Sequence, residues 1–320
     1  VILSTSLIEN LKAEFPDSKL DFLLRKGNEQ LLENNRKINK ILIWDKKQNK
    51  IVSLYKIMRL IKKQRYDLLI NLQRYFSTGL ISFFSKAKYK IGFSQNPFSF
   101  CYNKSILHVM TEGTHDIKRN HRLIEQLTAM EPQKPKLYPS EKQYENVKVY
   151  KRKKFITIAP ASVWFTKQFP EHKWVEFINQ LRFDGNIYFL GAPSDRELCE
   201  RIIATSEKTN CKNLCGEMSL LESAALMKDA LMNYVNDSAP QHICSALNAP
   251  VTAIFCSTIP EFGFGPLSSN SRVVQSNQNL DCRPCGLHGH RECPKGHFKC
   301  ANSIDVKELN FIQEGSISKD

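Results

Sequence analysis

Short, mostly apolar runs alternate along the chain with apolar residues at helical spacing. The runs lie at residues 66–72, 89–93, 155–159, 186–190 and 251–255, with shorter ones at 19–24 and within 38–44, and they are typical of buried parallel strands. Residues 51–61 and 111–130 predict helices, and Trp174, Phe177, Ile178 and Leu181 recur at i, i+3, i+4, i+7. The alternation predicts an α/β protein with two doubly wound, Rossmann-like halves.

A change in composition predicts where the two halves divide. Residues 131–140 are rich in proline and residues 148–154 are strongly basic, which is typical of a linker. We therefore expect an N-terminal domain at 1–147 and a C-terminal domain at 148–320. The chain enters an apolar helix directly after Val1, so we also expect a truncated first domain whose first strand would precede Val1.

One stretch, residues 233–255, has the pattern strand, polar turn, helix, strand. Asp237, Ser238 and His242 would lie beyond the carboxyl end of a parallel strand, where such sheets bind ligands. The helix beginning near Ala239 would offer free N–H groups to an anion. An ordinary turn remains the alternative, because Asp and Ser are also common helix caps.

Three segments in order resemble the glycosyltransferase family 9 heptosyltransferases, which build the inner core of lipopolysaccharide. The first is Lys167-Gln-Phe-Pro170 after a turn of small residues, the second is Asp237-Ser-Ala-Pro-Gln-His242, and the third runs from Pro260-Glu261 to Gly265-Pro-Leu267. The resemblance covers nearly the whole chain. It implies a GT-B fold, two Rossmann-like domains facing across a cleft, and inverting transfer of heptose from ADP-heptose to a lipid A/core glycolipid, with no cofactor required for catalysis.

The resemblance places donor binding in the C-terminal domain. Lys167 follows a predicted strand and would stabilise the departing diphosphate, although a lysine is more often a solvated surface residue. The expected donor-binding residues are Ser162, Thr166, Lys167, Glu217, Asp237, Ser238, Ala239 and His242.

Acceptor binding is expected in the N-terminal domain. Thr5 follows the expected missing turn, and Asn71, Gln73 and Arg74 end a predicted strand. Family members are thought to use an Asp in the N-terminal turn as general base, and that residue would lie before Val1. Asp116 is an alternative base, but a helical Asp beside Lys118 and Arg119 is more often a surface ion pair.

The chain is basic, with a formal charge of +14 and much of its Lys and Arg in the first half. Charge alone does not choose among a phosphorylated glycolipid, an anionic membrane surface and nucleic acid. We expect a cytoplasmic enzyme in peripheral contact with the inner membrane, because no apolar run reaches the ~18 residues of a membrane span. We expect no nucleic-acid partner, since basic and aromatic residues are not interleaved in a recognition motif.

Ten cysteines are present, and four of them cluster as C-x2-C-x7-C-x6-C. This spacing predicts a structural zinc ion, since few apolar residues are present to order the segment. Free thiols and disulfides remain alternatives. The expected ligands are Cys282, Cys285, Cys293 and Cys300.

Two other functions stay open at this point. The same fold could use another nucleotide sugar, because the sugar pocket cannot be read from these residues. A basic, zinc-stapled nucleic-acid-binding protein would explain the charge and the cysteines, but not two α/β halves.

Overall fold

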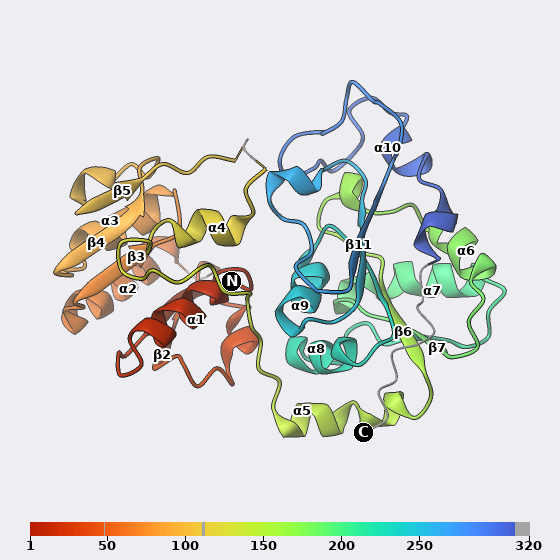
Figure 1. Cartoon of the computed structure of the whole chain (residues 1–320), viewed down its shortest axis with the longest axis horizontal. Coiled ribbons are helices and arrows are strands. Elements are labelled where there is room, and N and C mark those ends of the chain that lie inside the picture. The colour runs from red at the N-terminus through yellow and green to blue at the C-terminus, as the bar shows by residue number, and fades with distance from the viewer. Residues whose placement is uncertain (48, 111–112, 311–320) are drawn as a thin grey trace. The chain divides into compact units, whose positions relative to one another are not determined.

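The chain folds into two compact units, Val1–Lys136 and Leu137–Asp320. The computed structural model describes all residues except 48, 111–112 and 311–320 (Figure 1). The division falls earlier than the predicted boundary after residue 147. Helix α5 (Glu141–Asn146) packs on α8 (Leu220–Lys228), and Asn146 Nδ2 donates to Glu222 Oε1 at 2.6 Å. The segment before residue 148 therefore belongs to the C-terminal unit.

The N-terminal unit is built from parallel strands and helices. Its strands are β1 (Asp21–Arg25), β2 (Lys40–Trp44), β3 (Leu68–Asn71), β4 (Tyr89–Phe93) and β5 (Lys104–Ile106). Its helices are α1 (Thr5–Glu14), α2 (Lys50–Gln64), α3 (Phe76–Phe84) and α4 (Asp116–His121), with 3-10 turns at Glu29–Leu32 and Ser99–Cys101.

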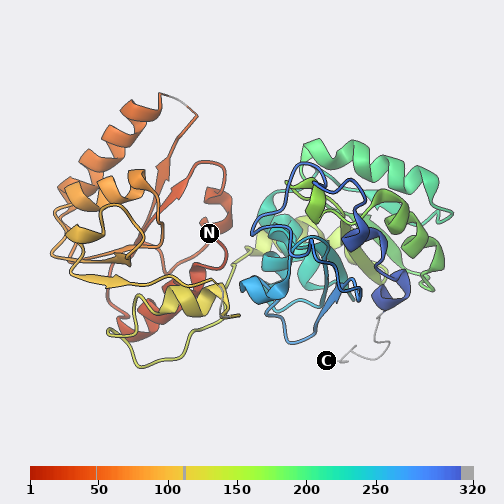
Figure 2. The ribbon, with the colours of Figure 1, turned by 90° about the horizontal axis from the view of Figure 1, so that it is seen from above.

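Strand β3 shows how side-chain alternation builds the core of this unit. Leu69 packs with Ile61 of α2 and Ile81 of α3, whereas Leu68 and Ile70 pack with Ile91 on the other face. Successive strand residues point to opposite faces, so β3 supplies both halves of the core. Figure 2 shows α2 and α1 on different sides of these strands.

The strands of the N-terminal unit form two sheets, β1-β2 and β3-β4-β5, with every pairing parallel. β1 and β3 are not hydrogen-bonded to each other within the described residues, and both line cavities of about 890 and 450 Å³.

The C-terminal unit contains a six-stranded, all-parallel sheet in the order β11-β10-β9-β6-β7-β8. The strands are β6 (Phe155–Ala159), β7 (Asn186–Phe189), β8 (Cys211–Asn213), β9 (Asn233–Asn236), β10 (Val251–Phe255) and β11 (Ser271–Gln275). The other helices are α6 (Glu171–Gln180), α7 (Arg196–Thr205), α9 (Ala239–Leu247) and α10 (Lys299–Asn302). Further 3-10 turns are Lys148–Lys151, Phe165–Lys167, Pro193–Asp195, Pro260–Phe262 and Val306–Leu309.

The predicted apolar face of α6 anchors the larger core. Trp174, Phe177 and Ile178 are fully buried, and the Trp174 ring meets Phe169 edge-on at 5.2 Å between centroids. Full burial of a large apolar side chain contributes about 1.5–3 kcal/mol. This face therefore fixes the segment between β6 and α6, which carries Lys167.

The helix predicted over 111–130 is largely wrong. Residues 111–112 lie outside the described residues, and the α-helix spans only Asp116–His121. The chain continues in tighter turns, in which Leu123 N donates to Asn120 O and Leu127 N to Ile124 O. Leu123 and its neighbour Ile124 are both buried, so burial of consecutive apolar residues outweighs the helical pattern.

No helix in the described part of the chain is long and apolar enough to cross a membrane.

We predict that Asn233→Ala destabilises the C-terminal unit. The buried Asn233 amide accepts from Thr157 Oγ1 at 2.5 Å and donates to Met227 O at 2.9 Å. The change leaves the buried Thr157 hydroxyl without this acceptor and removes one of the donors to Met227 O, which should cost about 1–3 kcal/mol. Urea unfolding would measure this loss, and the exposed Asn302→Ala provides the control. Equal midpoints for the two variants would contradict the assignment.

Candidate active site

The parallel sheet of the C-terminal unit has a position suited to a ligand at the carboxyl ends of its central strands. Counted from β6, the strands run 3-2-1-4-5-6 across the sheet, so their order reverses between β6 and β9. Doubly wound sheets bind ligands beyond the carboxyl ends of the strands at this reversal. The predicted residues Lys167 and Asp237 follow β6 and β9, and they meet there.

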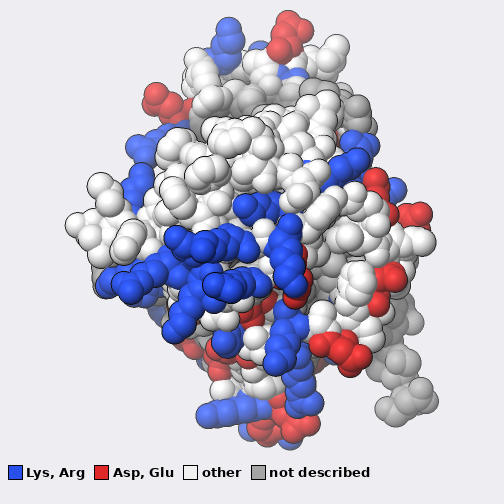
Figure 3. Space-filling model, turned by 90° about the vertical axis from the view of Figure 1, so that its left-hand side faces the viewer, with Lys and Arg blue, Asp and Glu red and all other residues white. Residues whose placement is uncertain are grey.

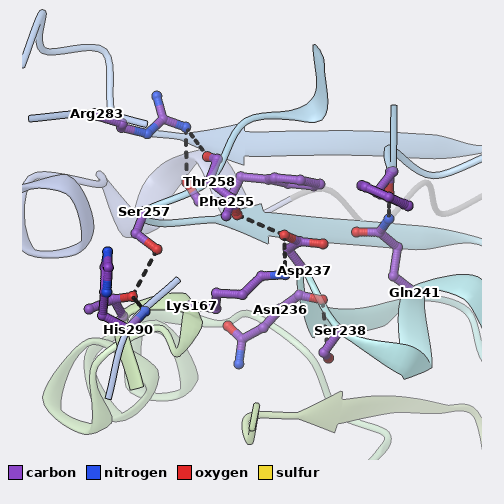
Figure 4. A network of polar contacts seen from close by, with 12 residues as sticks. Lys167, Asn236, Asp237, Ser238, Gln241, Phe255, Ser257, Thr258, Arg283 and His290 are labelled. Atoms are coloured by element: carbon purple, nitrogen blue, oxygen red, sulfur yellow. Dashed lines mark hydrogen bonds and ion pairs between the residues drawn. The ribbon is translucent and has the colours of Figure 1, made fainter. Parts of the chain in front are cut away.

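Lys167 and Asp237 form a buried ion pair at this position (Figure 4). Lys167 Nζ lies 2.6 Å from Asp237 Oδ2, and only 15% and 8% of the two side chains are exposed. The hydroxyl of Thr258, after β10, donates to the same carboxylate oxygen at 2.7 Å. A lysine ammonium has three donors, and the pair with Asp237 uses one of them. The site thus holds a cation in a fixed position with further donor capacity.

Asn236 fixes the loop that carries Lys167. Its side chain is fully buried, donates to Pro160 O at 2.6 Å and accepts from Phe169 N at 3.0 Å. These contacts join the last residue of β9 to both ends of the segment between β6 and α6. The amide therefore holds the Lys167 turn against the Asp237 turn.

The predicted residues Ser162 and Thr166 lie on this loop in different environments. Thr166 is buried, and its hydroxyl accepts from Ser257 Oγ at 3.1 Å and from His290 N at 2.8 Å. Ser162 is half-buried, and its carbonyl accepts from Gln168 Nε2 at 2.6 Å. Thr166 is thus occupied in joining three segments of the chain.

The predicted residues Ser238, Ala239 and His242 lie at the start of α9. Ser238 occupies the N-cap position, but its hydroxyl bonds to Asn236 O at 3.4 Å and does not cap the helix. Ala239 is exposed and His242 is half-buried on the first turn. The end of α9 therefore lies beside Asp237, and its dipole favours an anion there by about 0.3–1 kcal/mol.

Glu217, also predicted for donor binding, lies on another loop. It is exposed, and its carboxylate pairs with Arg196 at 3.3 Å. Arg196 also donates to Cys215 O at 2.8 Å. The structure therefore does not bring Glu217 to the Lys167–Asp237 pair, although it lies after β8 of the same sheet.

The predicted acceptor residues divide into buried and exposed pairs. Thr5 is fully buried, with its hydroxyl bonded to Ile2 O and Lys136 N, and Asn71 is buried against Ser82 and Tyr102. Gln73 and Arg74 are exposed after β3. The position of the first two indicates a structural role, whereas the last two face solvent. Asp116 pairs with Arg119 at 3.3 Å, but the expected surface location is wrong, since the two side chains are only 19% and 1% exposed.

The cysteine-rich loop is tied to the site through Arg283. Its guanidinium is half-buried and donates to Cys256 O at 2.8 Å, to Thr258 O at 2.9 Å and to Gln275 Oε1 at 2.7 Å. Cys285 N donates to Ser257 O at 2.8 Å. The loop therefore packs on the segment that follows β10.

The four predicted zinc ligands are not gathered into a metal site. Within the described residues, no three His, Cys, Asp or Glu side chains are placed to hold a metal, and the ten cysteines are free thiols. Burial also raises the pKa of the Cys300 thiol to about 11, whereas zinc binds the thiolate. Zinc binding would require the loop to rearrange, and it stays a prediction.

Three residues that shape the site are not among those predicted from the sequence: Asn236, Thr258 and Arg283. Asn236 directly precedes the predicted Asp237, and an Asn at the end of an apolar strand is a signal for a buried hydrogen bond. Thr258 follows the apolar run of β10 in the same way. Arg283 had no comparable signal, because its partners are backbone carbonyls far away in the sequence.

Sequence comparison identifies related proteins over most of the chain. Residues 54–295 match the family Glycosyltransferase family 9 (heptosyltransferase). Lipopolysaccharide heptosyltransferase 2 of Escherichia coli K12 is 24% identical over 86% of this chain and 84% of its own length. Lipopolysaccharide heptosyltransferase 3 of the same strain is 27% identical over 81% of this chain and 79% of its own length.

Solved structures show the same fold. E. coli ADP-heptose LPS heptosyltransferase II aligns over 96% of both chains with a TM-score of 0.75 and 21% identity. A glycosyltransferase family 9 protein from Veillonella parvula aligns over 85% of this chain and 81% of its own with a TM-score of 0.77 and 22% identity. The predicted α/β class with the GT-B fold is confirmed. The chain is a glycosyltransferase and belongs to family 9, the heptosyltransferases.

Proposed function

We propose that the protein transfers heptose from ADP-heptose to the inner core of lipopolysaccharide, with inversion at the anomeric carbon. The observation that carries this proposal is the Lys167–Asp237 pair at the strand reversal of the C-terminal sheet. Relatives named as lipopolysaccharide heptosyltransferases support the donor and acceptor classes. The proposed place of action is the cytoplasmic face of the inner membrane.

The chemistry requires an acceptor hydroxyl to attack the anomeric carbon as the bond to the ADP oxygen breaks. Negative charge then develops on the diphosphate, and Lys167 donates to it from a position fixed by Asp237. A fixed donor to developing charge contributes about 100- to 1000-fold in rate. The N-terminus of α9 adds a favourable dipole beside the same charge.

The role of Asp237 follows from its contacts. Its carboxylate is held by Lys167 and Thr258, so it orients the ammonium and is itself neutralised by it. The proton of the acceptor hydroxyl needs a separate base. Another nucleotide sugar remains the second candidate donor, and a panel of ADP-, UDP- and GDP-sugars would distinguish it.

We predict that Lys167→Ala lowers the transfer rate or ADP affinity at least tenfold, because the diphosphate loses its fixed cation. Calorimetry with ADP and a transfer assay with ADP-heptose would measure both quantities. Lys173→Ala is the matched control, since Lys173 is 17% exposed, much like Lys167, and pairs with Glu176 within α6. Unchanged binding and kinetics in Lys167→Ala would refute the assignment.

We predict that Asp237→Asn also lowers transfer at least tenfold and that its effect overlaps with that of Lys167→Ala. Two residues in one ion pair are not additive, so the double variant should lose no more than about threefold beyond the worse single variant. Fully multiplicative losses would show that the two side chains act independently.

We predict that Asn236→Ala weakens ADP binding at least fivefold, although the Asn236 side chain is buried and is not expected to contact the nucleotide itself. The change releases Pro160 O and Phe169 N, so the Lys167 turn should become mobile. Hydrogen exchange at residues 161–168 should accelerate in this variant and stay slow in Lys167→Ala. Slow exchange in Asn236→Ala would contradict the positioning role.

A further inference from the structure

The N-terminal unit exposes a cluster of aromatic rings on α3 and on the turn at Ser99–Cys101. The rings of Phe76, Phe83, Phe84, Phe98 and Phe100 form a connected set, with centroids between 5.0 and 5.9 Å apart. Phe76, Phe83 and Phe100 are 61%, 43% and 73% exposed. We call these five residues the aromatic patch. Exposed apolar patches of this kind mark interaction surfaces.

The surroundings of the aromatic patch are basic. Residues 74–110 contain no Asp or Glu, and neither does α2, which packs beside α3. On the side where Figure 1 labels α2 and α3, Lys and Arg gather beside a large uncharged region (Figure 3). Lys88 is paired with the exposed Asp67 at 2.7 Å. The basic residues of these segments are Lys50, Lys56, Arg59, Lys62, Lys63, Arg74, Lys86, Lys88, Lys90 and Lys104.

We propose that the aromatic patch inserts into the interface of an anionic phospholipid bilayer, while the lysines around it bind the headgroups. Aromatic side chains favour the membrane–water interface, and each basic residue near an anionic surface adds about 1 kcal/mol of attraction. Two further residues of α2, Ile51 and Tyr55, are also strongly exposed.

The ring geometry favours a bilayer over single-stranded nucleic acid. Bases stack on the open faces of aromatic rings. Here the rings lie edge-on or tilted against one another, with interplanar angles of 68° for Phe76–Phe98 and 85° for Phe83–Phe84. The rings are therefore clustered into one apolar surface and are not arranged as a row of parallel stacking platforms.

The aromatic patch is fixed to the exposed loop after β3. Asn96 is buried, donates to Gln73 O at 2.9 Å and to Tyr75 O at 3.2 Å, and accepts from Phe98 N at 2.9 Å. A side chain at Gly79 would collide with Asn96 and Phe98. A glycine there lets the turn that carries Phe98 pack closely on α3. Insertion would therefore place Gln73 and Arg74 next to the bilayer surface.

This inference deepens the proposed function, because a lipid-linked acceptor must be reached at a membrane. Phe76→Ser combined with Phe100→Ser should reduce binding to phosphatidylethanolamine vesicles containing phosphatidylglycerol at least tenfold in a sedimentation assay. Wild-type binding should weaken with added salt, since the Debye length is about 8 Å near 0.15 M. The control is Val163→Ser, which removes an exposed apolar residue of the C-terminal unit.

A second experiment gives a positive signal on membrane contact, so that misfolding of the double variant is not mistaken for lost membrane binding. The added fluorescence of Phe100→Trp should be quenched by vesicles of bromine-labelled lipid, and that of Val163→Trp should not. Equal vesicle binding by the double variant and the wild type would overturn the proposal. So would patch-dependent binding of an oligonucleotide without vesicle binding, or a wild-type dimer that the double variant converts to a monomer. ADP binding and transfer to a delipidated acceptor should persist in the double variant, which separates this test from the proposed function.

Discussion

The site depends on one constraint, which is that all strands of a parallel sheet end at the same edge. In the C-terminal unit this brings the residues after β6, β9 and β10 together, although they lie far apart in the sequence. The amide of Asn236 then fixes two of these segments to each other through Pro160 and Phe169. Lys167, Asp237 and Thr258 can approach within hydrogen-bonding distance only because this backbone frame already holds their turns.

This constraint explains why much of the fold and the central ion pair could be predicted from the sequence. Strands buried on both faces are continuous apolar runs, and the predicted runs 89–93, 155–159 and 251–255 coincide with β4, β6 and β10. Once the strands are placed, polar residues directly after them must share an edge. Asp237 directly follows β9, so it could be placed at this edge from the pattern alone. Lys167 lies further along the loop after β6, and its assignment to the same site came from the family resemblance.

The positions of several other predicted residues are decided by contacts between distant parts of the chain, which a local sequence pattern does not reveal. The apolar spacing of residues 111–130 predicts a helix, but Leu123 and Ile124 are both buried and the backbone follows them in tighter turns. Asn71 and Thr5 end up buried because their side chains satisfy backbone and side-chain partners within the N-terminal unit. A polar residue that ends a strand can face a ligand or cap the core, and only the packing around it decides which.

The cysteine-rich loop is another segment whose order depends on contacts with distant parts of the chain. The zinc hypothesis assumed that a segment with few apolar residues needs a metal to become ordered. The loop instead inserts Arg283 among the carbonyls that follow β10, and the backbone of His290 exchanges hydrogen bonds with Thr166. Hydrogen bonds to a charged donor contribute about 1.5–3 kcal/mol, so a few of them offset the missing apolar burial. The same contacts connect the loop to Thr166 and Ser257, and thus to the turn that carries Lys167. The same hydrogen bonds therefore order both the cysteine-rich loop and the turn that carries Lys167.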